Sequence, residues 1–158
     1  MDAIKPFSAQ LTQGQAGRTC NCRKRDECLL EGNCLSKGII YQAKVTSVNN
    51  TETYVGLTAI EFKARFRNHQ MSFNKEIRKN DTELSKHIWQ LKVKRQHYTI
   101  KWTILARAKP YSNQTKRCSL CMTEKHLIIT RPEHATLNKW NKLISTCRHW
   151  QKFIFRYN

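Results

Sequence analysis

Alternating apolar and polar residues predict three β-strands. Residues 38–48 alternate with a period of two, and residues 53–57 follow as the returning strand of a hairpin, after a turn signal at Asn49-Asn50. A third alternating stretch spans 98–106. The residues on its apolar side are Tyr98, Ile100, Trp102, Ile104 and Ala106.

Helical spacing predicts helices between and after these strands. Thr58-Ala-Ile-Glu61 has the form of a capping box, with Thr58 as the N-cap, and so opens a first helix. The apolar stripe of this helix consists of Phe62, Phe66, Phe73 and Ile77. Asn80-Asp81 ends this helix and caps a second one.

The second helix carries one apolar face, made of Leu84, Ile88 and Leu91. A third helix begins near residue 116 and stops before Pro132, and a further short helix is predicted over 136–146. The order ββααβα contains few strands. We therefore predict an α+β fold, in which a small three-stranded antiparallel sheet is flanked by helices.

The chain of 158 residues has room for one domain of ordinary size. Polar composition without periodicity predicts a flexible tail at 1–19. We expect a Cys-rich zinc-binding segment at 20–36, the α+β domain at 37–147, and a basic and aromatic extension at 148–158.

Basic residues outnumber acidic ones by 29 to 11, which gives a formal net charge of +18. The excess is concentrated in Leu84–Asn158, which contains 16 Lys and Arg residues but only two acids, Glu124 and Glu133. A nucleic acid is therefore the first partner to consider. The alternative is the solvated basic face of a structural protein in a ribonucleoprotein.

The sequence disfavours a membrane or secreted protein. No apolar run approaches the roughly 20 residues that span a bilayer, and Met1–Thr19 lacks an apolar signal stretch. We therefore expect an intracellular protein. In that setting its seven cysteines favour metal ligation or free thiols over disulfides.

Two tyrosines of the predicted hairpin are candidates for chemistry. A hairpin loop of two or four residues places Tyr54 opposite Val45 or Ser47, on the same face as Tyr41. Both tyrosines would then look outward together. The alternative is structural, because tyrosine is an ordinary strand-forming residue.

Three further side chains are candidates for the same chemistry. Arg65 and His69 are four residues apart, so they share a helix face that is offset from the phenylalanine stripe. Glu124 is one turn from Leu120, so its carboxylate leans toward the core. Cleavage of phosphodiesters needs a carboxylate to hold a divalent metal, and Glu124 is well placed for this. A solvated arginine and a salt bridge of Glu124 are the structural alternatives.

The order of these residues resembles a known motif. Gly38-Ile39-Ile40-Tyr41 is followed by Tyr54-Val55-Gly56, by an Arg and a His four apart, by a helical Glu, and by Leu137-Asn138. Over roughly residues 35–145 this arrangement resembles the GIY-YIG nuclease domain. The chain departs from the family by one inserted residue in the first motif and by Val for Ile in the second.

A narrower similarity exists as well. The upstream cysteines, the stretch Asp81–Trp89 and the stretch Cys118–Lys125 are similar to the endonuclease domain of Penelope-like retroelements. In that group the nuclease follows a reverse transcriptase. The resemblance therefore implies that 37–147 is a GIY-YIG nuclease domain.

The resemblance implies a catalytic site that consists of Tyr41, Tyr54, Arg65, His69, Glu124 and Asn138. Tyr41 is implied as the general base toward water, with help from Tyr54. An ordinary phenol titrates near pH 10, so Arg65 and a bound metal must stabilise its deprotonated form. Arg65 is also implied to steady the scissile phosphate.

The resemblance also implies which residues bind the metal and which support the site. Glu124 is implied to bind a single Mg²⁺ or Mn²⁺ ion, and His69 to handle a proton or contact the phosphate. Asn138 matches a family residue that supports the site. Gly56 fits as the small residue that allows close approach beneath it.

The implied function is a divalent-metal-dependent DNA endonuclease of retroelement type, which nicks duplex DNA and leaves a 3′-hydroxyl to prime reverse transcription. A reverse transcriptase domain in a related full-length element is an expected partner, and the nucleus is the expected location. The alternative is a catalytically inactive, zinc-stabilised module that binds nucleic acid.

Four cysteines stand before the first strand, at positions Cys20, Cys22, Cys28 and Cys34. Structural zinc takes four Cys or His ligands, and a small domain gains folding energy from it. The resemblance implies a finger that includes Cys28, Cys34 and His87. A purely local interpretation uses the four N-terminal cysteines instead.

Three cysteines lie further along the chain. Cys118-x-x-Cys121 has the spacing of a zinc knuckle or a redox pair. Because it lies within a predicted helix, we expect it to pack beside Glu124, and the alternative joins it with the upstream cysteines in one site. Cys147 is expected to be a lone thiol.

Overall fold

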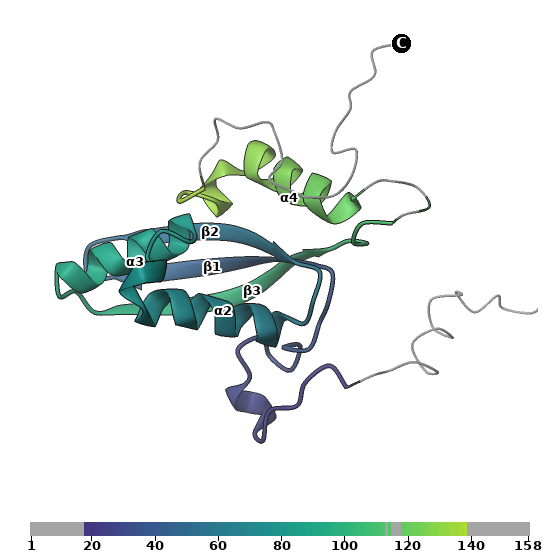
Figure 1. Cartoon of the computed structure of the whole chain (residues 1–158), viewed down its shortest axis with the longest axis horizontal. Helices are drawn as coiled ribbons and strands as arrows, with labels where there is room; N and C mark the ends of the chain where they lie inside the picture. Colours follow the sequence, from purple (N-terminus) through teal and green to yellow (C-terminus); the bar gives the residue numbers. More distant parts are fainter. Residues whose placement is uncertain (1–17, 113, 115–117, 139–158) are drawn as a thin grey trace, which may run out of the picture.

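The computed structural model describes residues 18–112, 114 and 118–138. It shows an α+β fold in which a three-stranded antiparallel sheet lies between two helices on one face and one helix on the other (Figure 1). The elements are η1 (Arg25–Glu27), β1 (Ile39–Ser47), β2 (Thr51–Thr58), α2 (Phe62–Asn74), η2 (Glu76–Arg78), α3 (Glu83–Val93), β3 (Tyr98–Arg107), α4 (Ser119–Thr130) and η3 (Pro132–His134). The predicted order ββααβα is confirmed.

The register of the hairpin determines which side chains share a face. The sheet has the order β2-β1-β3, so β1 is its central strand. Tyr41 pairs with Gly56, and Ala43 pairs with Tyr54. Because residues two apart in a strand point to the same face, Tyr41 and Tyr54 share a face of the sheet.

The hairpin closes earlier than predicted. The N–H of Ser47 donates to the carbonyl of Asn50 at 2.8 Å, so the turn comes before the predicted one. The prediction that Tyr54 lies opposite Val45 or Ser47 is therefore wrong. Tyr41 and Tyr54 still lie on the same face, because the strand pairing differs from the predicted one by an even number of residues.

A buried core lies on each face of the sheet. The core on the side of α2 and α3 contains Leu30, Ile39, Tyr41, Ala43, Val45, Tyr54, Phe62, Phe73, Leu84, Ile88, Leu91 and Trp102. The core under α4 contains Ile40, Val55, Cys118, Leu120, Cys121, Ile128 and Ala135. The expectation that Tyr41 and Tyr54 look outward is wrong, because α2 covers their face and leaves them 0% and 9% exposed.

Strand β3 has one extra residue opposite β1. Ile40 pairs with Ala106, but Tyr41 pairs with Ile104, so the register shifts between them. A bulge of this kind changes the face that the neighbouring side chains occupy. Ala106 therefore packs in the core under α4, and the prediction that it shares a side with Trp102 is wrong.

Helix α2 begins differently from the prediction. Its first residue is Phe62 and its N-cap is Glu61, whose side chain makes no capping hydrogen bond. The predicted capping box is wrong because Thr58 ends β2, and its hydroxyl donates to the carbonyl of Ile60 at 3.0 Å. The first N–H groups of α2 donate to carbonyls of the Cys-rich segment instead.

The boundary between α2 and α3 also differs. Ile77 lies beyond the end of α2, in η2, and is 92% exposed rather than part of the apolar stripe. The N-cap of α3 is Thr82, not Asn80-Asp81, and its hydroxyl accepts from the N–H of Ser85 at 3.0 Å. Leu84, Ile88 and Leu91 are buried, as predicted.

Some predictions concern residues outside the described ranges. These are most of the tail at 1–19, most of the helix at 136–146, Cys147 and the extension at 148–158. Residues 136–138 are described and do not form a helix. Nowhere in the described ranges does a helix combine the length and the apolar character that a membrane span needs.

Replacing Gly56 by Ala is expected to destabilise the protein by about 2 kcal/mol or more. The added Cβ would lie 2.5 Å from the hydroxyl oxygen of Tyr41 and 2.6 Å from its Cζ, so the ring would have to move. Urea unfolding measures the effect, with Thr51→Ala at the exposed start of β2 as the control. An unchanged midpoint in Gly56→Ala would show that Tyr41 does not pack against β2.

Candidate functional site

The hydroxyl of Tyr41 is held between two side chains of α2. Nε2 of His69 lies 2.7 Å from the hydroxyl oxygen, and Nε of Arg65 donates to the same oxygen at 3.1 Å. Three predicted site residues therefore meet. His69 is not offset from the phenylalanine stripe, as we expected, but lies on it: it follows Phe62 by seven residues and stacks on Phe73 with 6.0 Å between ring centroids.

The ring of Tyr41 lies across the neighbouring strand at Gly56. Any side chain at that position would collide with the ring, so only glycine leaves room for it. Phe62 and Trp102 pack against the same ring, with centroid separations of 5.3 and 5.8 Å. This arrangement carries the hydroxyl from the central strand β1 over the edge strand β2, beneath α2.

Tyr54 contributes the second phenol from β2. Its ring centroid lies 6.1 Å from that of His69, and its hydroxyl interacts with Arg65. Burial, followed by the charges of Tyr41 and Glu124, raises the pKa of Tyr54 well above its ordinary value. Arg65 therefore joins both phenols, and Tyr54 is protonated at neutral pH.

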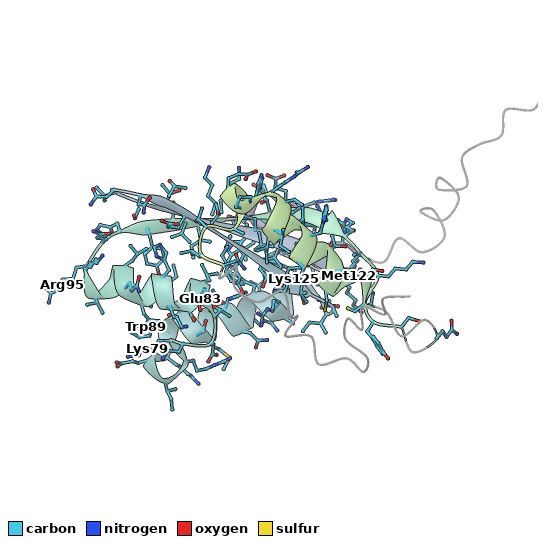
Figure 2. All side chains as sticks on the ribbon, turned by 90° about the horizontal axis from the view of Figure 1, so that it is seen from above. Lys79, Glu83, Trp89, Arg95, Met122 and Lys125 are labelled. Atoms are coloured by element: carbon cyan, nitrogen blue, oxygen red, sulfur yellow. The ribbon has the colours of Figure 1, made fainter. Side chains whose placement is uncertain are left out.

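Glu124 reaches the site from α4. Leu120 and Ile128 bury this helix against Ile40 and Val55, on the opposite face of the sheet from α2. The side chain of Glu124 is half-buried. Figure 2 shows Met122 and Lys125, its neighbours in the sequence, on the same helix.

The carboxyl of Glu124 is electrostatically coupled to the tyrosines. Burial raises its pKa to about 7, although the positive charges of Lys125 and Arg65 oppose the shift. Its negative charge in turn raises the pKa values of Tyr41 and Tyr54. Burial thus outweighs the nearby positive charges and makes the ionised carboxylate costly, and a bound cation would lower that cost.

Burial also sets the protonation of the other groups. It raises the pKa of Tyr41 to about 12, against the lowering effect of Arg65. It lowers the pKa of His69 to about 3, and the charge of Arg65 adds to this shift. At neutral pH Tyr41 is therefore a phenol and His69 a neutral imidazole. Nε2 of that imidazole accepts the Tyr41 proton in the tautomer that carries its own proton on Nδ1.

Asn138 binds the outer edge of β2 next to Tyr54. Its Oδ1 accepts from the N–H of Val55 and its Nδ2 donates to the carbonyl of Val55, both at 2.9 Å. The N–H of Leu137 donates to the carbonyl of Thr53 at 2.8 Å. The segment after α4 therefore pairs with the edge strand on both sides of Tyr54 and fixes its backbone.

The four N-terminal cysteines form a group that could hold a metal ion. Their sulfur atoms all lie within 4.8 Å of one another. Sγ of Cys34 lies 3.6 Å from that of Cys20 and 3.7 Å from that of Cys22. Four sulfur ligands around one tetrahedral zinc at about 2.3 Å are about 3.8 Å apart, so the spacing suits this metal.

The environment of these thiols also favours a cation. Burial by itself would raise the pKa of Cys28, but the N–H groups of Leu30 and Gly32 donate to its sulfur and lower the pKa below its ordinary value. Burial raises the pKa of Cys34, and the neighbouring cysteines add to that rise. The thiols repel one another once they lose their protons, so a bound divalent ion would be needed to stabilise them together.

The other candidate metal ligands lie elsewhere. His87 is half-buried on α3 and is not part of the group, so among the described residues the structure assembles the local set of four cysteines. Cys118 and Cys121 are a separate buried pair with their sulfur atoms 3.2 Å apart. Sγ of Cys118 accepts from the N–H of Cys121 at 3.4 Å and caps α4, the helix that carries Glu124.

Comparisons with protein-family models, with curated proteins and with solved structures found no match to this chain. The interpretation of the site therefore depends on its own residues. β1, β2 and α2 bring Tyr41, Tyr54, Arg65 and His69 together, and α4 adds Glu124.

Trp102 belongs to the surroundings of the site, although no sequence pattern predicted it there. Its ring centroid lies 5.4 Å from that of His69, and it also contacts Tyr41. The alternating pattern placed Trp102 on an apolar side of a strand, but it did not reveal that this strand pairs with β1 at Ala43. Local periodicity predicts which side chains share a face of a strand, but it does not predict which strand pairs with it.

We expect one Zn²⁺ per chain, bound by the four N-terminal cysteines. Cys22→Ser should lose the metal, because a serine hydroxyl does not replace a thiolate ligand. His87→Ala should retain it, because His87 lies outside the group. Metal analysis of the purified variants measures the stoichiometry, and loss of zinc from His87→Ala with retention in Cys22→Ser would contradict the assignment.

Glu124→Gln is expected to stabilise the protein more at pH 8 than at pH 5. Folding raises the pKa of this carboxyl from 4.5 to about 7, so the carboxyl's contribution to stability falls as pH rises through that range. Glutamine stays neutral and avoids the loss, which we put at about 1–2 kcal/mol at pH 8. Urea unfolding at both pH values tests this, and an equal effect at both would contradict the raised pKa.

Proposed function

We propose that this chain is a divalent-metal-dependent DNA endonuclease of the GIY-YIG type. The observation that supports the proposal best is the Tyr41 hydroxyl, which contacts Arg65 and His69 and lies in the field of Glu124. Hydrolysis of a phosphodiester requires a group that takes a proton from water, a cation for the phosphate and a ligand for a metal. These residue types meet those three requirements.

Arg65 is the proposed phosphate ligand. It is half-buried, and its Nε donates to the hydroxyl of Tyr41. A guanidinium carries five N–H donors in a planar fork, and those left free by the phenols suit two oxygens of a phosphate. A phosphate held there lies next to the Tyr41 hydroxyl.

Glu124 is the proposed ligand of Mg²⁺ or Mn²⁺. Mg²⁺ commonly binds one or two carboxylates and completes its shell with water and substrate phosphates. A single half-buried carboxylate whose pKa is raised to about 7 fits this pattern, because a nearby cation would offset the cost of its charge. When bound, the metal supplies stabilisation of the negative charge on the phosphate and on the leaving oxygen.

The proposed proton path runs through Tyr41 and His69. The hydroxyl oxygen of Tyr41 takes a proton from water as its own proton moves to Nε2 of His69, 2.7 Å away. The low pKa of His69 opposes this transfer, and part of that lowering comes from Arg65. A phosphate anion at Arg65 offsets its charge, so substrate binding would make His69 a better acceptor.

DNA is the proposed substrate, and zinc the proposed second metal. The net charge of +18 favours a polyanion, which would release counterions on binding. By the resemblance, the nick would leave a 3′-hydroxyl that primes reverse transcription in the nucleus, next to a reverse transcriptase domain of a related element. An all-thiolate tetrahedral site favours Zn²⁺ over harder ions.

The test is conversion of supercoiled plasmid to open circle with and without Mg²⁺. We expect the wild-type protein to nick the plasmid only with the metal, and Glu124→Gln to reduce the rate by about 100-fold or more. Glu133→Gln is the matched control, because it removes the same charge from an exposed acid. It should leave the rate unchanged.

Binding measured by gel retardation separates the two functions. Glu124→Gln should bind plasmid as tightly as the wild-type protein or more tightly, since it removes a negative charge. Retardation without nicking in Mg²⁺ or Mn²⁺ would contradict the nuclease and support the inactive nucleic-acid-binding module. Nicking that does not depend on Glu124 would contradict the metal ligand.

A further inference from the structure

The N-terminus of α2 is capped by the Cys-rich segment. The N–H of Phe62 donates to the carbonyl of Ser36 at 3.0 Å, and the N–H of Lys63 donates to the carbonyl of Cys34 at 2.8 Å. The Nζ of Lys63 also donates to Oδ1 of Asn21 at 2.6 Å. Since the side chain of the N-cap residue makes no capping hydrogen bond, these carbonyls cap the helix in its place.

The same segment contains the metal group. Cys34 supplies one of the four sulfur atoms and also the carbonyl that accepts from Lys63. Asn21 lies between two other cysteines of the group. Leu30, between Cys28 and Cys34, packs in the same core as Phe62. The position of the capping carbonyls therefore depends on the conformation that the four sulfur atoms share.

We infer that the metal-bound four-cysteine segment is the N-terminal cap of α2 and thereby positions Arg65 and His69 against Tyr41. Arg65 lies at the end of the first turn, where its N–H donates to the carbonyl of Glu61 at 3.2 Å. A first turn that loses its cap frays. Fraying would release Arg65, the residue that holds both phenols. The segment thus acts on the site through α2, without touching substrate.

Only the consequence for cleavage rests on the proposed nuclease. If the inference is correct, removal of Zn²⁺ slows nicking in Mg²⁺ because Arg65 is no longer held. The positioning itself has a readout that does not involve DNA, namely backbone amide hydrogen exchange.

The experiment compares amide exchange in the zinc-loaded and zinc-free full chain by NMR. Loss of a cap should accelerate exchange at Phe62 and Lys63 by about five- to thirtyfold. Ser85 in α3 is the internal control, because its N–H is bonded to the side chain of Thr82, within its own helix. Its exchange should change less than about twofold.

A rescue variant distinguishes capping from general support of the fold. Glu61→Ser places a capping hydroxyl at the N-cap of α2 without changing any thiol. In zinc-free protein its hydroxyl can accept from the second or third N–H of α2, so it should restore slow exchange at Lys63 or Ala64 but not at Phe62. In zinc-loaded protein it should have little effect. Rescue would confirm that the metal acts through the cap.

Two other outcomes would contradict the inference. Unchanged exchange at Phe62 and Lys63 after zinc removal would show that the segment does not need the metal to cap α2. An equal acceleration at Ser85 that Glu61→Ser does not reduce would show that the metal supports the whole domain. Confirmed exchange changes together with the absence of nicking in both forms would retain the inference and reject the nuclease.

Discussion

The structure of the site depends on the close approach of Tyr41 to Gly56. The hairpin register places these residues opposite each other, and the absence of a side chain at Gly56 lets the phenol ring lie across the edge strand. In this position its hydroxyl forms hydrogen bonds with Arg65 and His69 on α2, and the charge of Glu124 on α4 raises its pKa. Two side chains of α2 thus contact this oxygen atom, and a carboxylate of α4 on the other face of the sheet acts on it through its charge.

Burial removes most of the charge from this site. Tyr41 and Tyr54 are protonated, His69 is neutral, and Glu124 titrates near neutral pH, so Arg65 retains the one full charge among these five residues. Such a site costs stability in the free protein, which is common where groups are prepared for a ligand. A phosphate bound at Arg65 would neutralise that positive charge, and a cation bound at Glu124 would favour its ionised carboxylate. The electrostatics of the site therefore suit the proposed reaction.

Sequence periodicity predicted the order of elements and the shared face of Tyr41 and Tyr54, because both depend on local spacing. It failed where distant parts of the chain decide the outcome. The tyrosines are covered by α2 rather than exposed, and the cap of α2 comes from the distant carbonyls of Cys34 and Ser36 rather than from Thr58. The bulge that turns Ala106 to the other face likewise belongs to a pairing with β1. The role of Trp102 was missed for the same reason, since no local pattern reveals which strand it faces.

Single-turnover nicking by Tyr41→Phe, with the protein in excess over supercoiled plasmid, would measure what the Tyr41 hydroxyl contributes to cleavage. This variant retains the buried ring and loses only the hydroxyl that Arg65 and His69 contact. The account predicts a rate in Mg²⁺ lower by about 100-fold or more, with plasmid binding unchanged. Nicking at the wild-type rate would contradict it, because the atom on which the site converges would then have no part in the reaction.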